Sequence, residues 1–142
     1  MSSKAAFNAI KGVLDTYSAG VGALPVRYEN EFVQDLLDAN TAAWVYVEVF
    51  GDFFDQASIG AEPVTANRWR EGGVVFMHVM VPSGSGSGLA RGYAGDLIEL
   101  FQGQEIDGVR FRDASIGEGE PGRDFPNYWA MAASIEWERD TA

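Results

Sequence analysis

The spacing of apolar residues predicts a helix near the start of the chain. Between residues 3 and 17, large apolar side chains recur three or four positions apart, which places them on one face of a helix. These side chains are Phe7, Ile10, Leu14 and Tyr17. Serines precede the segment and can cap its first turn, while Gly20 and Gly22 follow it and favour its end. The sequence therefore predicts a helix with one buried face.

A second stretch with helical spacing covers residues 89–101. Its apolar side chains share one face, and the alanines among them allow a close approach to a sheet. They are Leu89, Ala90, Tyr93, Ala94, Leu97, Ile98 and Phe101. Asp96 and Glu99 fall outside this face, so we expect both to contact water.

Alternating and β-branched segments predict the strands of a sheet. Residues 44–50 and 74–81 are rich in valine and aromatic residues, and we expect them to pair antiparallel. Shorter strands are predicted at residues 26–29 and 108–112. The last predicted strand, residues 128–139, alternates apolar residues with polar ones, so one face should be core. That face consists of Trp129, Met131, Ala133, Ile135 and Trp137.

Three segments between these elements have no decisive pattern. The chain from Asn30 to Thr41 fits either a short helix or a loop. Residues 51–62 fit either a protruding loop or the continuation of a long hairpin. Residues 113–124 are acidic and rich in glycine, so we expect a loop there.

Two adjacent aromatic residues, Phe53 and Phe54, stand in a polar segment between Asp52 and Asp55. Consecutive residues of a strand point to opposite faces, so both rings cannot enter one core face. Exposed aromatic side chains are common at contact surfaces, although an irregular loop that buries both rings is an equally good interpretation. We expect residues 52–55 to form a protruding loop that contacts another protein.

Length and composition indicate one folded domain. A chain of 142 residues with 46% hydrophobic and 13% aromatic residues can bury a core, and its mixed patterns predict an α+β fold. The absence of cysteine excludes disulfides and thiolate metal sites. The first residues lack the apolar core of a signal peptide, and the longest apolar run, residues 42–47, is too short to span a bilayer. We therefore expect a soluble protein made in the cytosol.

Charge narrows the possible partners. Twenty-one acidic and ten basic residues give a formal net charge of −11, which repels phosphate backbones and anionic membranes. Specific binding of nucleic acid or of a membrane is therefore disfavoured. A negative surface fits simple solubility, and it also fits a passage through which DNA slides without binding.

One turn lies where phosphate-binding loops also lie, between a predicted strand and a predicted helix. It runs from Ser83 to Gly88. Its alternating glycines match neither the dinucleotide fingerprint nor the P-loop, and no Lys-Ser or Lys-Thr pair follows. We interpret it as a flexible crossover loop that can touch a partner through its serines, which are Ser83, Ser85 and Ser87.

The remaining polar candidates favour structural roles. His78 lies among apolar residues of a predicted strand, and the chain has no second histidine to share a metal ion with it. The acidic pairs Asp52/Asp55 and Glu118/Glu120 lack the multi-ligand pattern of a calcium site. We therefore predict no catalytic residue, no metal site and no cofactor, and a protein that is not an enzyme.

The order of the segments along nearly the whole chain carries a family resemblance. Two signatures stand out: a strand that ends in Val81-Pro82 before the small-residue loop, and the turn Ser115-Ile116-Gly117 before a final aromatic strand. The matching segments are residues 5–17, 26–30, 44–50, 56–60, 67–69, 79–88, 90–101, 108–110 and 114–117. In this order the chain resembles the tail-terminator-like proteins of long-tailed bacteriophages and gene transfer agents.

This resemblance implies a single α+β domain, residues 1–142, in which two helices pack on one face of a mainly antiparallel sheet. It implies a virion protein of the tail, assembled in the cytoplasm of the bacterial host, that forms a homo-oligomeric, hexameric ring on the head-proximal end of the tail tube. The ring would end tube polymerisation and join the tail tube protein to the head connector or stopper protein, while DNA passes through without specific binding.

In such a ring, we expect the contacts with neighbouring subunits or the tube to come from the polar loops and the paired phenylalanines. The residues concerned are Asp52, Phe53, Phe54, Asp55, Arg68, Arg70, Ser83, Ser85 and Ser87. Two other function classes stay open. One is a small-molecule or nucleotide-binding regulatory domain that uses the loop from Ser83 to Gly88, and the other is a hydrolase, which the shortage of nucleophiles and metal ligands argues against.

Overall fold

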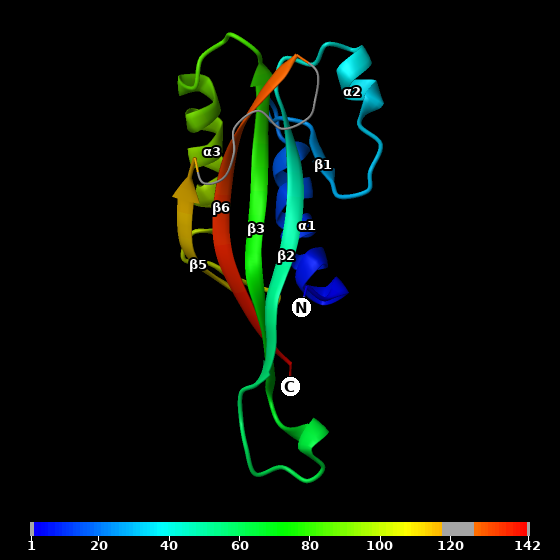
Figure 1. Ribbon diagram of the computed structural model, residues 1–142, viewed down its shortest axis with the longest axis vertical. Helices are drawn as coiled ribbons and strands as arrows, with labels where there is room; N and C mark the ends of the chain where they lie inside the picture. The colour runs from blue at the N-terminus through cyan, green and yellow to red at the C-terminus, as the bar shows by residue number, and fades with distance from the viewer. Residues whose placement is uncertain (1, 118–126, 142) are drawn as a thin grey trace.

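The computed structural model describes residues 2–117 and 127–141 of the chain. Its elements in chain order are α1 (Lys4–Ser18), β1 (Val26–Tyr28), α2 (Gln34–Asp38), β2 (Trp44–Gln56), the 3-10 helix η1 (Val64–Ala66), β3 (Trp69–Pro82), α3 (Gly88–Phe101), β4 (Glu105–Ile106), β5 (Val109–Ile116) and β6 (Tyr128–Thr141). The long axis of the molecule follows β2, β3 and β6 (Figure 1).

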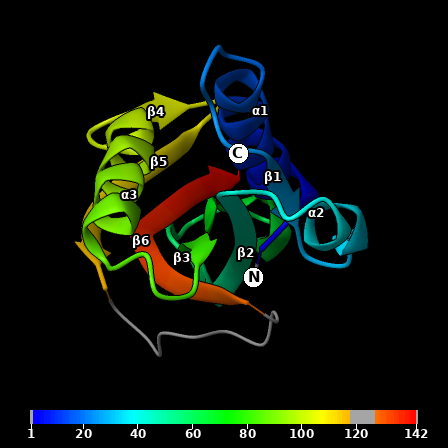
Figure 2. The same ribbon diagram turned by 90° about the horizontal axis from the view of Figure 1, so that it is seen from above.

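The strands form one six-stranded sheet in the order β1-β2-β3-β6-β5-β4. All neighbouring strands pair antiparallel except β1 and β2, which pair parallel. Seen from above, the sheet is curled, with α1 beside β1 and α3 beside β5 and β6 (Figure 2). The expected α+β class and mainly antiparallel sheet are therefore confirmed.

The main core lies between one face of this sheet and the two long helices. Alternate residues of β2, β3 and β6 enter it, and so do the predicted apolar faces of α1 and α3. From the strands they include Val45, Val47, Val49, Val75, Met77, Val79, Met131, Ala133, Ile135 and Trp137, and from the helices Ile10, Leu14, Ala90, Ala94, Leu97 and Phe101. The period-two pattern of the last strand is thus confirmed, with Trp129 partly buried against the same core.

A smaller cluster covers one end of the opposite face. The segment from Asn30 to Thr41, for which the sequence left helix and loop open, contains the short helix α2. Leu36 of this helix packs with residues that alternate with the main core, namely Trp44, Met80, Tyr128 and Ala130. Farther from α2 the same face is less covered, because Phe76 is partly exposed and Glu136 is exposed.

The start of α1 is tied to the sheet by a buried carboxylate. Ser3 caps the helix, since its hydroxyl oxygen accepts a hydrogen bond from the backbone N–H of Ala6 at 3.2 Å. The same hydroxyl donates a hydrogen bond to Glu71 of β3, whose side chain is fully buried. The first helix is thereby positioned by a contact 68 residues away in sequence.

Two sequence expectations about the ends of elements were wrong. Leu89, placed on the buried face of the second helix, is 51% exposed, and the buried side chains of α3 begin at Ala90. Residues 113–116, expected in a loop, continue β5. Residues 118–124 of that expected loop lie outside the described residues.

Trp137 provides a test of the core. Its side chain is 2% exposed, and it pairs with Gly73 and Phe111 on the neighbouring strands. We expect Trp137→Ala to lower the free energy of unfolding by about 3–5 kcal/mol, the range for deletion of a large buried aromatic side chain. Urea denaturation followed by circular dichroism measures this change. Trp69→Ala, which removes a partly exposed indole, is the matched control and should cost clearly less.

Candidate interaction surface

The hairpin formed by β2 and β3 extends well beyond the helices (Figure 1). Its strands stay paired as far as Gln56 and Trp69, and the backbone N–H groups of Ala57 and Ser58 both bond to the carbonyl oxygen of Arg68. The turn beyond is held by Asn67, which is 5% exposed and whose side-chain oxygen accepts from the N–H of Ala61 at 3.0 Å. Residues 51–62 are therefore the end of a long hairpin, one of the two alternatives left open by the sequence.

Residues 52–55 form part of a paired strand, which corrects the expectation of a free loop there. A bulge at Asp52 interrupts the ladder, so that Gly51 faces Gly73 and the next register pair is Phe53 with Gly72. A bulge adds one residue to one strand and changes which face the following side chains occupy. The segment still protrudes, but as a hairpin arm.

Two consecutive glycines make this arm possible. A Cβ atom on Gly73 would lie 1.8 Å from the carbonyl oxygen of Phe50, a backbone clash that no side-chain movement relieves. A Cβ atom on Gly72 would lie 2.5 Å from the ring of Phe53, so the ring occupies the space that a side chain would fill. Close backbone approach is a common reason for glycine within a strand.

The paired phenylalanines are both partly exposed. Phe53 covers Gly72, whereas Phe54 stacks on Trp69 with ring centroids 5.4 Å apart. The exposed fractions are 37% for Phe53 and 42% for Phe54, so the expectation of at least one exposed ring is confirmed. Further apolar side chains of the arm are exposed or partly exposed. They lie on both faces of the arm, since Phe50 contacts Phe76 whereas Phe54 stacks on Trp69. Together they are called the hairpin surface, defined as Phe50, Phe53, Phe54, Ile59, Val64 and Trp69.

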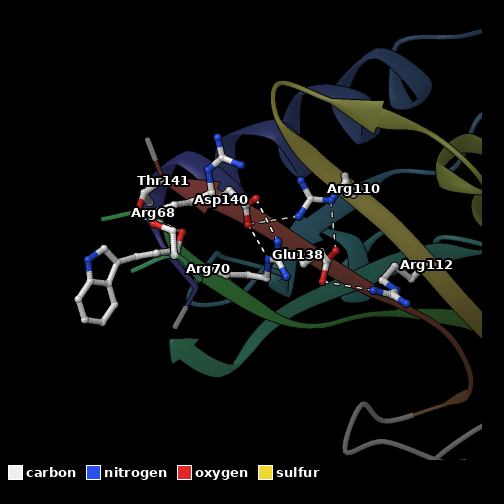
Figure 3. Close-up of polar contacts among 9 residues, drawn as sticks. Arg68, Arg70, Arg110, Arg112, Glu138, Asp140 and Thr141 are labelled. Carbon is white, nitrogen blue, oxygen red and sulfur yellow. Dashed lines mark hydrogen bonds and ion pairs between the residues drawn. The ribbon is translucent and has the colours of Figure 1, made fainter. Parts of the chain in front are cut away.

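A ladder of ion pairs crosses the base of the arm (Figure 3). Arg70 and Asp140 are register partners on β3 and β6, with Nε and Oδ1 2.7 Å apart. Arg110 of β5 reaches both Glu138, at 3.1 Å, and Asp140, at 3.3 Å. Arg112 also contacts Glu138, at 3.4 Å. The ladder joins three adjacent strands on the face of the sheet opposite the main core, since Phe111 and Trp137, which alternate with ladder residues, are core residues.

The ladder perturbs the titration of its central carboxylate. Hydrogen bonding to Arg70, and then to Arg110, lowers the pKa of Asp140 from its ordinary value of 3.8 to about 2, against the opposing effect of burial. Arg68, the other arginine expected at this site, is exposed and directly precedes β3. The sequence pattern pointed to Arg68 and Arg70 but not to Arg110, Arg112, Glu138 and Asp140, because the contacts among these residues depend on strand register.

The three serines of the glycine-rich turn lie at the other end of β3 from the arm (Figure 1). Ser85 donates to the carbonyl oxygen of Pro82 at 2.7 Å, and the hydroxyl of Ser87 accepts from Arg91 at 3.4 Å. Positive φ angles at Gly84 and Gly86 explain the glycines of this turn. The structure thus divides the nine expected interface residues between two opposite ends of the sheet.

The remaining polar candidates are in structural settings. His78 is 7% exposed, and its Nε2 lies 2.7 Å from Oε1 of Glu48 on the neighbouring strand, as a buried structural histidine would. Within residues 2–117 and 127–141, no group of three or more His, Cys, Asp or Glu side chains could hold a metal ion. Asp52 and Asp55 are exposed, whereas Glu118 and Glu120 lie outside the described residues. In the same described ranges, no helix is long and apolar enough to cross a membrane.

Comparison with known proteins supports the fold. No family model matches the sequence, and no curated protein matches it. Among solved structures, 32 chains match. One of them, a protein without a descriptive name, aligns with 100% of this chain and 98% of its own length, with a TM-score of 0.63 and 23% identity. This likeness shows a shared fold.

The glycine pair gives a prediction for the arm. Gly73→Ala should separate β2 from β3 at the bulge and lower the free energy of unfolding by at least about 3 kcal/mol, because the clash is with backbone. Gly72→Ala should cost less, about 1–2 kcal/mol, since the ring of Phe53 can turn away and only a small shift relieves the 3.0 Å contact with the carbonyl oxygen of Trp137. Chemical denaturation measures both. Gly95→Ala in α3, where nothing lies within 4 Å, is the control and should be neutral or slightly stabilising.

The ion-pair ladder predicts a specific pH dependence. Because the pKa of Asp140 is lower in the folded state, its ionised form stabilises the fold above pH 4, and this contribution is lost as the pH falls through about 2. Asp140→Asn should therefore flatten the decline in stability between pH 4 and pH 2. Denaturation midpoints across that range test this, and Arg70→Gln should act in the same direction. Arg91→Gln, at an exposed arginine of α3, controls for loss of charge.

Proposed function

We propose that this protein is a tail-terminator-like subunit that forms a ring on the head-proximal end of a phage-type tail tube, ends tube polymerisation and joins the tail to the head. The observation that carries the proposal is the hairpin arm. It extends beyond the helix-covered sheet and presents an apolar surface that is too exposed to serve as core. Exposed apolar patches on a folded domain indicate contact with another protein.

The placement of the candidate residues also supports a subunit that works between two partners. The hairpin surface lies at one end of β3, and the serine-glycine turn lies at the other. A ring subunit between a tube and a head connector has to offer two different surfaces along the axis. The two ends of this sheet differ in this way, since one is apolar and aromatic and the other consists of small polar residues.

Charge fits the same function. The chain carries a formal net charge of −11, and the arginines at the base of the arm are paired with carboxylates of β6. A surface that repels phosphate suits a ring through which DNA passes without binding.

Replacing both aromatic rings of the arm tests the proposal. Phe53→Ser/Phe54→Ser should leave the subunit folded, because both side chains are at least 37% exposed, but should prevent assembly and tail capping. Circular dichroism and light scattering measure folding and assembly. Electron microscopy of particles measures capping, with overlong, headless tails expected when the chain is missing or carries the double change.

A matched control replaces two exposed apolar residues away from the arm. Val21→Ser/Phe32→Ser changes side chains that are 109% and 72% exposed, and it should support normal tails. If the Phe53/Phe54 variant unfolds, the arm belongs to the core. If that variant folds and still yields headed tails of normal length, the arm is not the contact surface and the proposal loses its main support.

A further inference from the structure

The sheet has two open edges on opposite sides. On one side, β1 pairs with residues 45–47 of β2 and Glu29 accepts a hydrogen bond from the N–H of Val49, so the outer edge of β2 is covered only to that point. Residues 50–56 then pair with β3 alone among the described strands, and all of them are exposed. An open edge of this length with apolar side chains is a template for pairing with another strand.

The other open edge belongs to β5. Its first residues pair with β4, and the N–H of Phe111 bonds to the carbonyl oxygen of Gln104 at 3.1 Å. After an interruption of the ladder at Arg112 and Asp113, residues 114–116 pair with β6 alone among the described strands, and residues 112–116 are all exposed. The last of these, Ile116, is 38% exposed.

The directions of the two edges are complementary. Three successive antiparallel pairings, β2 with β3, β3 with β6 and β6 with β5, make β2 and β5 run in opposite directions. Rotation about a ring axis preserves the direction in which each strand runs along that axis. The β2 edge of one copy would therefore meet the β5 edge of the next copy antiparallel, which is the more stable pairing.

The charges of the two edges differ. The open edge of β2 carries Asp52 and Asp55, and both are exposed. The open edge of β5 carries one charge of each sign: Asp113, which is exposed, and Arg112, whose side chain is 60% exposed and also contacts Glu138 of its own chain at 3.4 Å. Opposite charges across strands stabilise pairing, and like charges oppose it.

We propose that copies of this chain associate edge to edge, with residues 50–56 of β2 pairing with residues 112–116 of β5 in the neighbouring copy. The contact is head-to-tail, so the same two edges recur around a closed ring and the sheet becomes continuous. Strand register places Phe111 level with Gly51. The same register places Ile116 level with Val47, so the two open segments are offset along the strands. The proposal therefore requires strands that are tilted from the ring axis, as in closed barrels, because tilt staggers neighbouring copies. The proposal specifies the interface of the ring proposed above and does not depend on what the ring caps.

Cysteine cross-linking tests this pairing, because the chain contains no cysteine. We expect purified Asp52→Cys/Arg112→Cys protein, treated with a short bismaleimide, to give a ladder of covalent oligomers that ends at the closed ring. Each single variant should stay uncross-linked, since a residue in a head-to-tail contact does not meet its own copy. Asp52→Cys/Ser85→Cys, with the second cysteine at the far end of the sheet, is the matched control and should give no ladder.

Charge reversal gives a second measurement in solution. Arg112→Glu should weaken self-association about tenfold at low salt, and Asp55→Arg in the same chain should restore it, because each chain supplies both edges. Arg91→Glu, the same charge change on α3, should have little effect. Analytical ultracentrifugation measures all three.

Several results would overturn the proposal: efficient cross-linking of a single variant, a ladder in the control pair only, or a chain that stays monomeric at its highest soluble concentration. These results are separable from failure of the proposed function. If rings cap tails but the cross-links form elsewhere, only the proposed edge pairing is wrong. If the ring is edge-paired but has no effect on tails, only the proposed capping function is wrong.

Discussion

The structure depends on the pairing of β3 with both of its long neighbours. β3 pairs with β6 over its whole length and with β2 over almost all of it. This double pairing fixes the register of three strands at once, and with it the face on which each side chain lies. The apolar residues of one face then form the surface on which α1 and α3 pack.

The same pairing explains why the arm exists. The helices cover only the part of β2 and β3 that carries alternating valines, whereas the strands continue to Gln56 and Trp69. Beyond the helices, strand pairing replaces the packing that the core provides elsewhere, and the ion pairs of Arg70 and Arg110 with β6 join the strands at the base of the arm. Surface ion pairs add little individually, so the arm depends mainly on its backbone ladder and on the close approach at Gly72 and Gly73.

Features that depend on residues close together in the sequence could be predicted, and features that depend on contacts between distant segments could not. The face of β6 that contains Trp137 followed from simple alternation, and α1 from its spacing and its cap at Ser3. The bulge at Asp52 could not be predicted, because it arises where two distant glycines let backbones approach. The contacts of Arg110 with β6 could not be predicted for a related reason. They depend on how β5 and β6 are aligned, and the pairing of these two strands is interrupted after Phe111.

The distribution of charge on the open edges bears on how a chain with such edges avoids aggregation. The exposed aromatic side chains of Phe50, Phe53 and Phe54 favour association of the β2 edge with another strand. The neighbouring Asp52 and Asp55 oppose the pairing of two copies of this edge, because their like charges repel. The β5 edge carries Arg112 beside Asp113, so it repels the β2 edge less than a second β2 edge does. Charges of this kind disfavour a two-fold dimer and leave a head-to-tail contact, which closes into a ring when the rotation between copies permits. Selectivity among contacts would then come from a few charged residues, while the backbone edges and the exposed rings supply the affinity.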